Sequence, residues 1–164
     1  MTNLSFKKII FYILILTAIF LLDRFSKLYI LNLAETTSEV NLYIYSFLNF
    51  YLIWNTGISF GLFSSSHVLF YNFITLLIIL INIIILIMII KSKDKRLFFL
   101  LVILGESLGN LFDRLYYKAV PDFIELHYNG FHWFIFNVAD IFITVGVISM
   151  VILEITNNNK QKNE

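Results

Sequence analysis

Two aspartates, Asp122 and Asp140, are the residues of this chain best suited to carry out chemistry. Asp122 follows Val120-Pro121 and precedes Phe123, an extended apolar setting in which a carboxylate gains nothing unless it meets a partner. Two carboxylates a few ångströms apart cannot both ionise, so they share a proton, and one can act as a base while the other acts as an acid. We predict that Asp122 and Asp140 form a dyad of the aspartic-protease type, which activates water against a peptide carbonyl.

Further polar side chains lie within apolar segments at helical spacing. Asn110, Asp113 and Arg114 occupy positions i, i+3 and i+4, so they form one patch on a helix. Gly105 and Gly109 form a pair of small residues that lets a neighbouring helix approach closely. This segment is therefore expected to pack inside a helix bundle with its polar patch at one end.

Asn137 and Asp140 lie three residues apart on the last apolar segment, and Asp23 and Lys27 form an i, i+4 pair on the first. Charges inside apolar segments are costly and are usually paired. The structural interpretation, ion pairing that satisfies charges at the rim of the bundle, is favoured for Asp23, Lys27, Asp113 and Arg114.

Other chemistries have weaker support. The chain has no His-Glu-x-x-His motif, and His67, His127 and His132 lack the spacing of metal ligands, so we expect no metal site and no cofactor. The serines at 64–66 have no base at recognisable spacing. A proton-coupled carrier that uses Asp23, Glu106 and Asp113 as relays is one alternative, and a purely structural membrane subunit is another.

The amino-acid composition indicates whether this chain folds in water or in a membrane. The chain has 164 residues, of which 59% are hydrophobic and 14% charged, with a mean hydropathy of +0.83. This is too apolar for a soluble domain, so residues 1–164 are expected to form a single integral membrane domain. The net charge of +1 argues against a nucleic-acid partner. The absence of cysteine excludes disulfides, thiolate metal sites and a cysteine nucleophile.

Four segments are long and apolar enough to cross a bilayer, which takes roughly 20 helical residues. They are residues 9–31, 69–90, 97–115 and 134–155, followed by a polar tail at 157–164. The predicted fold class is an all-α membrane protein, a bundle of four transmembrane helices. Positive residues flank one side of this arrangement, so both termini are expected in the cytoplasm, and Asp122 and Asp140 at the outer face. These residues are Lys7, Lys8, Lys91, Lys93, Lys95, Arg96, Lys160 and Lys162.

The first outer connection is too long for a simple turn. Residues 40–63 are rich in Tyr, Phe, Ile and Trp with partial alternation, which predicts a small extracytoplasmic β-sheet between the first and second helices. Its aromatic residues suit the membrane interface. Asn55 and Gly57 lie among these aromatic residues, where an amide can bind a peptide backbone.

The chain closely resembles the type II signal peptidases of bacteria, the lipoprotein signal peptidase family, along nearly its full length. Two positions depart from the family pattern, because Glu106 stands where a small residue is usual and Pro121 where an aliphatic one is usual. The resemblance rests on five blocks in order: Asp23-Arg24 with Lys27; Trp54-Asn55-Thr56-Gly57 through Phe60-Gly61; Gly109-Asn110-Leu111-Phe112-Asp113-Arg114; Pro121-Asp122-Phe123; and Phe136-Asn137-Val138-Ala139-Asp140.

This resemblance implies a multi-pass aspartic protease of the bacterial inner membrane. The enzyme would remove the signal peptide of a prolipoprotein just before its diacylglyceryl-modified cysteine, with membrane lipid around it, and we expect it to act as a monomer. The sequence does not assign the acid and the base, because the pair titrates as a unit. By position, Asp122 and Asp140 match the catalytic pair, and the substrate site is matched by Asn55, Asn110, Arg114 and Asn137.

Overall fold

The computed structural model of the protein describes residues 6–37, 39–57, 68–92 and 95–162. Several residues discussed above lie outside this part, namely 58–61, the serines at 64–66, His67 and Lys93. The described helices are α1 (Phe6–Thr37), α2 (Val68–Lys91), α3 (Arg96–Tyr117) and α4 (Val138–Lys162). The described strands are β1 (Asn41–Tyr45), β2 (Leu48–Asn55), β3 (Val120–Tyr128) and β4 (Phe131–Phe136).

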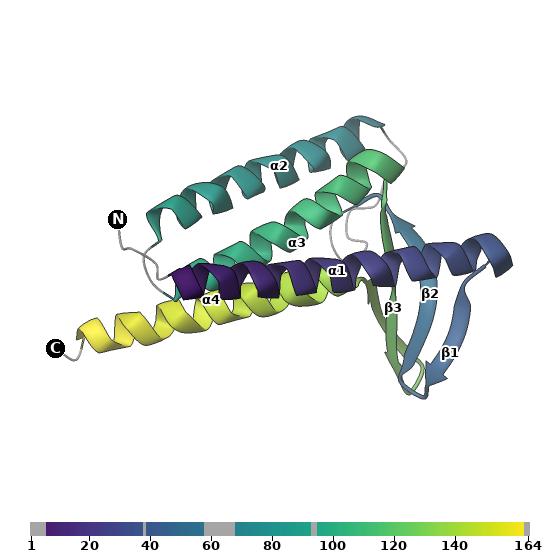
Figure 1. Ribbon diagram of the computed structural model, residues 1–164. Coiled ribbons are helices and arrows are strands. Elements are labelled where there is room, and N and C mark those ends of the chain that lie inside the picture. The colour runs from purple at the N-terminus through teal and green to yellow at the C-terminus, as the bar shows by residue number, and fades with distance from the viewer. Residues whose placement is uncertain (1–5, 38, 58–67, 93–94, 163–164) are drawn as a thin grey trace.

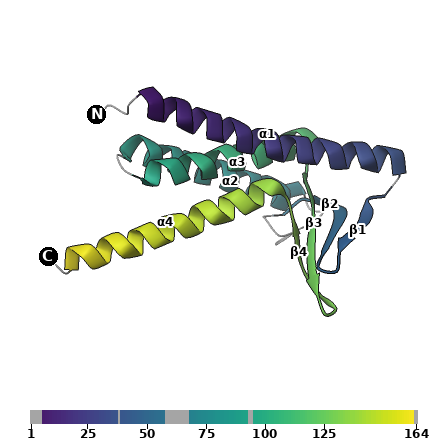
Figure 2. The ribbon, with the colours of Figure 1, turned by 60° about the horizontal axis from the view of Figure 1, so that its bottom comes forward.

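The four helices run alongside one another, and the sheet lies across one end of the bundle (Figure 1). Both chain termini lie at the opposite end, as the turned view also shows (Figure 2). Helix α3 is central, since it contacts α1, α2 and α4. Each helix therefore brings its sheet-facing end close to the strands.

Within the described residues, three helices are long and apolar enough to cross a membrane, namely α1, α2 and the Val138–Thr156 part of α4. Helix α3 is not among them and carries Glu106, Asp113 and Arg114 on its buried side, so the predicted span at 97–115 stays a prediction. The predicted fourth segment began at residue 134, but α4 begins at Val138 because the preceding residues continue β4. The apolar side chains of the helices are largely exposed, as expected for surfaces that face lipid.

The sheet is antiparallel with strand order β1-β2-β3-β4. Strands β1 and β2 come from the connection between α1 and α2, where the sequence predicted a sheet. Strands β3 and β4 come from the connection between α3 and α4, where no strand was predicted. The pairing of β2 with β3 places Asn55 opposite Val120 and Ile53 opposite Asp122. The sheet therefore joins both connections and brings two predicted site residues together.

Pro121 fits this sheet because of its place in β3. It pairs with Trp54 of β2, whereas the pairing of β3 with β4 begins only at Ile124. A strand position with a neighbour on one side tolerates a residue that has no N–H to donate. Pro121 thus holds the backbone next to Asp122 without breaking the strand pairing.

A small apolar core connects the sheet to the helices. Ile30 of α1, Val40 and Phe123 of β3 are buried together, and the ring of Phe50 meets that of Phe123 edge-on at 5.9 Å. Full burial of a side chain of this size contributes roughly 1.5–3 kcal/mol. This packing fixes β3 against the end of α1 and so fixes the position of the neighbouring Asp122.

Candidate active site

One cavity of about 160 Å³ is lined by all six residues predicted for catalysis and substrate binding. It lies where the bundle meets the sheet, and Ile78, Ile81 and Ile143 form part of its apolar wall. Four elements and the residue before α4 supply the polar lining: Asn55 (β2), Asn110 and Arg114 (α3), Asp122 (β3), Asn137, and Asp140 (α4).

Asp140 is positioned by the start of α4. The backbone N–H of Asp140 donates to Asn137 Oδ1 at 3.1 Å, and the backbone N–H of Asn137 donates to Asp140 Oδ2 at 3.3 Å. This reciprocal pair is a capping box, which satisfies N–H groups left free at a helix start. The spacing of Asn137 and Asp140 in the sequence therefore reflects a helix cap that presents a carboxylate to the cavity.

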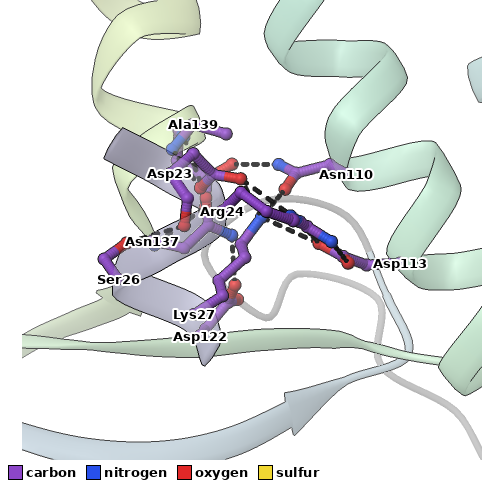
Figure 3. A network of polar contacts seen from close by, with 10 residues as sticks. Asp23, Arg24, Ser26, Lys27, Asn110, Asp113, Asp122, Asn137 and Ala139 are labelled. Carbon is purple, nitrogen blue, oxygen red and sulfur yellow. Dashed lines mark hydrogen bonds and ion pairs between the residues drawn. The ribbon is translucent and has the colours of Figure 1, made fainter. Parts of the chain in front are cut away.

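Asp122 is fully buried and is held by two amide groups. Asn55 Nδ2 donates to Asp122 Oδ2 at 2.8 Å, and Asn137 Nδ2 donates to Asp122 Oδ1 at 2.6 Å. The Asn137 side chain thus contacts Asp122 while it also caps the helix that carries Asp140. Figure 3 shows the Asn137 side chain at Asp122, and its hydrogen bond from the Asp140 N–H makes Asn137 the link between the two aspartates.

One pattern of hydrogen bonds orients the amide side chains of Asn55, Asn110 and Asn137. In each, Oδ1 accepts a hydrogen bond from a group that can only donate, so the NH₂ group points at a carboxylate. Asn110 Nδ2, for example, donates to Asp140 Oδ1 at 3.2 Å. The donors to the three Oδ1 atoms are Gly57 N–H at 2.8 Å, Lys27 Nζ at 2.6 Å and Asp140 N–H at 3.1 Å, respectively.

The environment of Asp122 favours its protonated form. Burial, followed by the negative charge of Asp140, raises the pKa of Asp122 from 3.8 to about 7, against the lowering effect of the Asn55 and Asn137 amides. A carboxyl group with such a pKa can carry a proton near neutral pH. The cavity therefore holds two acids whose charges are coupled, as a shared proton requires.

A second polar cluster lies next to the cavity, formed by Asp23, Arg24, Lys27 and Asp113. Lys27 Nζ lies 2.8 Å from Asp23 Oδ2 and 2.9 Å from Asp113 Oδ2. Arg24 binds the carboxylate of Asp113 with two nitrogens, at 2.6 and 2.8 Å. Asp23 Oδ1 also accepts the backbone N–H of Ala139 at 3.0 Å, so this cluster fastens α1 to the start of α4.

Arg24 and the backbone of Ala139 were not predicted to take part. Arg24 lies three residues before Lys27, so helical spacing places the two side by side on the surface of α1. The long side chain of Arg24 reaches Asp113 on α3. The predicted polar patches contain more acidic than basic residues, and this excess could have indicated that a further cation such as Arg24 takes part.

Arg114 does not pair with an acid as the structural interpretation predicted. Its Nη1 donates to the carbonyl of Thr56 at 3.0 Å, its Nη2 donates to the carbonyl of Gly57, and its guanidinium lies over the ring of Tyr71. Asp113 is instead bound by Arg24 and Lys27. The pairing prediction was wrong because carbonyl acceptors cannot be read from side-chain spacing.

The remaining candidate residues lie apart from the dyad. His127 and His132 stack across β3 and β4, with His132 Nδ1 at 2.9 Å from Glu125 Oε1. Within the described part of the chain, no group of three or more His, Asp or Glu side chains is arranged to hold a metal ion. Glu106 is buried on α3, and its Oε2 has no hydrogen-bond partner among the described residues.

Comparison with known proteins gives a consistent result. The model of the family described as Signal peptidase (SPase) II matches residues 15–156. The chain is 49% identical to the lipoprotein signal peptidase of Pelagibacter ubique over 164 residues, which covers 100% of this chain and 99% of that protein. It is 34% identical to the lipoprotein signal peptidase of Aquifex aeolicus, covering 93% and 90%. A solved bacterial membrane enzyme superposes with a TM-score of 0.71 at 26% identity, covering 93% of this chain and 92% of that one.

Proposed function

Because the chain belongs to the signal peptidase II family and removes signal peptides from prolipoproteins, we propose that it does so as an aspartic endopeptidase with Asp122 and Asp140 as its catalytic pair. One observation carries this proposal. Two buried carboxylates line one cavity, and a single side chain, that of Asn137, contacts Asp122 while it caps Asp140.

The chemistry begins with the proton on Asp122 and the negative charge on Asp140. Asp140 takes a proton from water as the water oxygen bonds to the scissile carbonyl carbon, and Asp122 donates its proton to the carbonyl oxygen. When the tetrahedral intermediate collapses, Asp140 gives its proton to the leaving nitrogen and Asp122 recovers its own. The pKa of Asp122, raised to about 7 by burial and by the charge of Asp140, supports this division of roles.

The N–H groups around Asp140 support its role as the base. Its Oδ1 accepts from Asn110 Nδ2 and its Oδ2 accepts from the backbone N–H of Asn137. Hydrogen bonds to both oxygens favour the charged form of a carboxylate. Asp122 accepts two hydrogen bonds as well, but burial and the charge of Asp140 raise its pKa to about 7, so we assign the proton to Asp122 and the negative charge to Asp140.

The substrate proposed is a prolipoprotein whose cysteine carries a diacylglyceryl group, cut just before that cysteine. The decisive experiment measures turnover of a diacylglyceryl-modified lipobox peptide in detergent by the purified chain and by Asp140→Asn. We expect cleavage by the first and none by the second, with both folded. Substantial cleavage by folded Asp140→Asn would end the aspartic proposal while leaving the family assignment intact.

We place the protein in the bacterial inner membrane as a monomer with four spanning helices. Both termini lie at the end of the bundle away from the sheet, as a cytoplasmic location for both requires. One chain supplies every residue described around the cavity, so the site needs no second copy. A reporter fused after Lys93 is expected to be cytoplasmic and one fused near Lys118 extracytoplasmic, and the reverse result would place the cavity on the wrong side.

A further inference from the structure

The side chain of Lys27 is buried and has all three of its donors occupied. Its Nζ lies 2.8 Å from Asp23 Oδ2, 2.6 Å from Asn110 Oδ1 and 2.9 Å from Asp113 Oδ2. An ammonium group carries three donors and no acceptor, so these three contacts use its full capacity. Two of the partners are carboxylates that neutralise its charge, but the third is a neutral amide.

The contact with Asn110 dictates which way that amide faces. Asn110 Oδ1 faces Lys27, and Asn110 Nδ2 lies 3.2 Å from Asp140 Oδ1. Rotation of the amide by a half turn would point its N–H groups at the ammonium and its oxygen at the carboxylate. Both contacts would then be repulsive, so the cation on α1 selects one orientation of an amide on α3.

We infer that Lys27 is a positioning residue for the reaction, because it fixes the Asn110 amide so that this amide donates a hydrogen bond to Asp140. This inference rests on the proposed function of Asp122 and Asp140. The Asn137 N–H occupies Oδ2 of Asp140 and the Asn110 amide donates to Oδ1, so the orientation that Lys27 gives this amide decides whether a donor or an acceptor faces the proposed base.

Other charged groups surround this chain of contacts and must be kept constant in a test. They come from three elements: Asp23 and Arg24 on α1, Glu106, Asp113 and Arg114 on α3, and Asp122 on β3. Removal of Lys27 alone would leave an excess of negative charge beside Asp140. A charge-balanced variant avoids this effect, since Asp113 is a partner of Lys27 that does not line the cavity.

The experiment compares Lys27→Met/Asp113→Asn with the wild type, whose net charge it shares, and with its parent Asp113→Asn, which measures the effect of the Asp113 change alone. The readout is turnover of a diacylglyceryl-modified lipobox peptide across a range of pH. We expect kcat to fall about 10- to 100-fold with KM nearly unchanged, as for a misplaced catalytic group. The acidic side of the pH profile should also move to higher pH, because an Asn110 carbonyl facing Asp140 disfavours its charged form. Equal kcat and equal profiles at equal folded fraction would overturn the inference.

A second comparison separates positioning from structural support. In the same parent, Lys27→Met should lower kcat little further once Asn110→Ala is present, because contacting residues that act together are not additive. A purely structural role predicts the same loss with and without Asn110 and would also overturn the inference. Asp140→Asn in the same assay separates a failure of the proposed function from a failure of this inference. If Asp140→Asn is active, the proposed catalytic pair is wrong. If Asp140→Asn is inactive and Lys27→Met has no effect, only the positioning role of Lys27 is wrong.

Discussion

Four buried aspartates lie near the sheet-facing end of the described bundle, in two pairs with different partners. Asp23 and Asp113 are bound by Lys27 and Arg24. Asp122 is equally buried, but the amides of Asn55 and Asn137 bind it instead. A carboxylate paired with a cation is held in its charged form, whereas the amides at Asp122 do not outweigh burial and the charge of Asp140, so Asp122 can accept a proton. The type of partner, and not the depth of burial, therefore distinguishes an aspartate that supports the fold from one that we propose for catalysis.

The largest expected effect comes from removing proton transfer within the proposed catalytic pair. Asp122→Asn and Asp140→Asn should each lower turnover of the lipidated lipobox peptide by at least about 1000-fold, because an amide cannot take up or release the proton. Since the pair acts as one unit, the double variant should be no worse than either single one. Thermal unfolding in detergent checks that the variants remain folded.

For Asp23 and Asp113, the pair bound by cations, we expect substitution to lower stability more than turnover per folded molecule. Asp113→Ala leaves Arg24 and Lys27 with one acid fewer, and breaking a buried pair costs about 3–5 kcal/mol of the free energy of unfolding. The measurement is the thermal midpoint together with turnover per folded molecule. If Asp113→Ala unfolded normally but lost its turnover, the contrast between the two pairs would fail.

The pH dependence of stability sharpens the comparison further. The pKa of Asp122 is raised from 3.8 to about 7, by burial first and by the charge of Asp140 second. The protonated form is therefore favoured by folding, so its contribution is complete below about pH 4 and is lost as the pH rises through 7. Between pH 5 and pH 8 the wild type should lose on the order of 3 kcal/mol relative to Asp122→Asn. Parallel unfolding curves for the two proteins over this range would contradict the assignment.

The smallest of these effects concerns Arg114, which binds backbone instead of an acid. Arg114→Ala frees the carbonyls of Thr56 and Gly57, and we expect a loss of about 1–3 kcal/mol in stability. Turnover should fall as well, because Gly57 N–H orients Asn55, which in turn holds Asp122. Arg114→Lys is the matched control: it keeps the charge but not the paired donors, so it should recover only part of the loss in both measurements.

Local patterns in the sequence predicted much of the helical fold. The apolar runs located the four helices, with ends that differ from the observed ones by one to seven residues. Helical spacing grouped Asn110 with Asp113 and Asn137 with Asp140. Asn137 could be grouped with Asp140 because a helix cap depends only on neighbouring residues. These features are local, so periodicity alone is enough to find them.

Contacts between distant segments were harder to predict. The strand β3 was missed because Pro121 and Asp122 near its start are residue types depleted in strands, although residues 124–128 alternate between apolar and polar. The partner of Asp113 was missed because Arg24 lies 89 residues away, on another helix. The acceptors of Arg114 are backbone carbonyls, which every residue has, so no residue type marks them.

The sheet that joins both outer connections also determines when the site can form during synthesis. Asn55 must meet Asp122 across 67 residues, and Asp23 must meet Ala139 across 116, so these contacts close long loops. A chain that has emerged only as far as α3 lacks β3, Asn137 and Asp140, and its Asn55 has no carboxylate to hold. The cavity is therefore completed only when the last helix is in place, so a partly synthesised chain lacks the complete site.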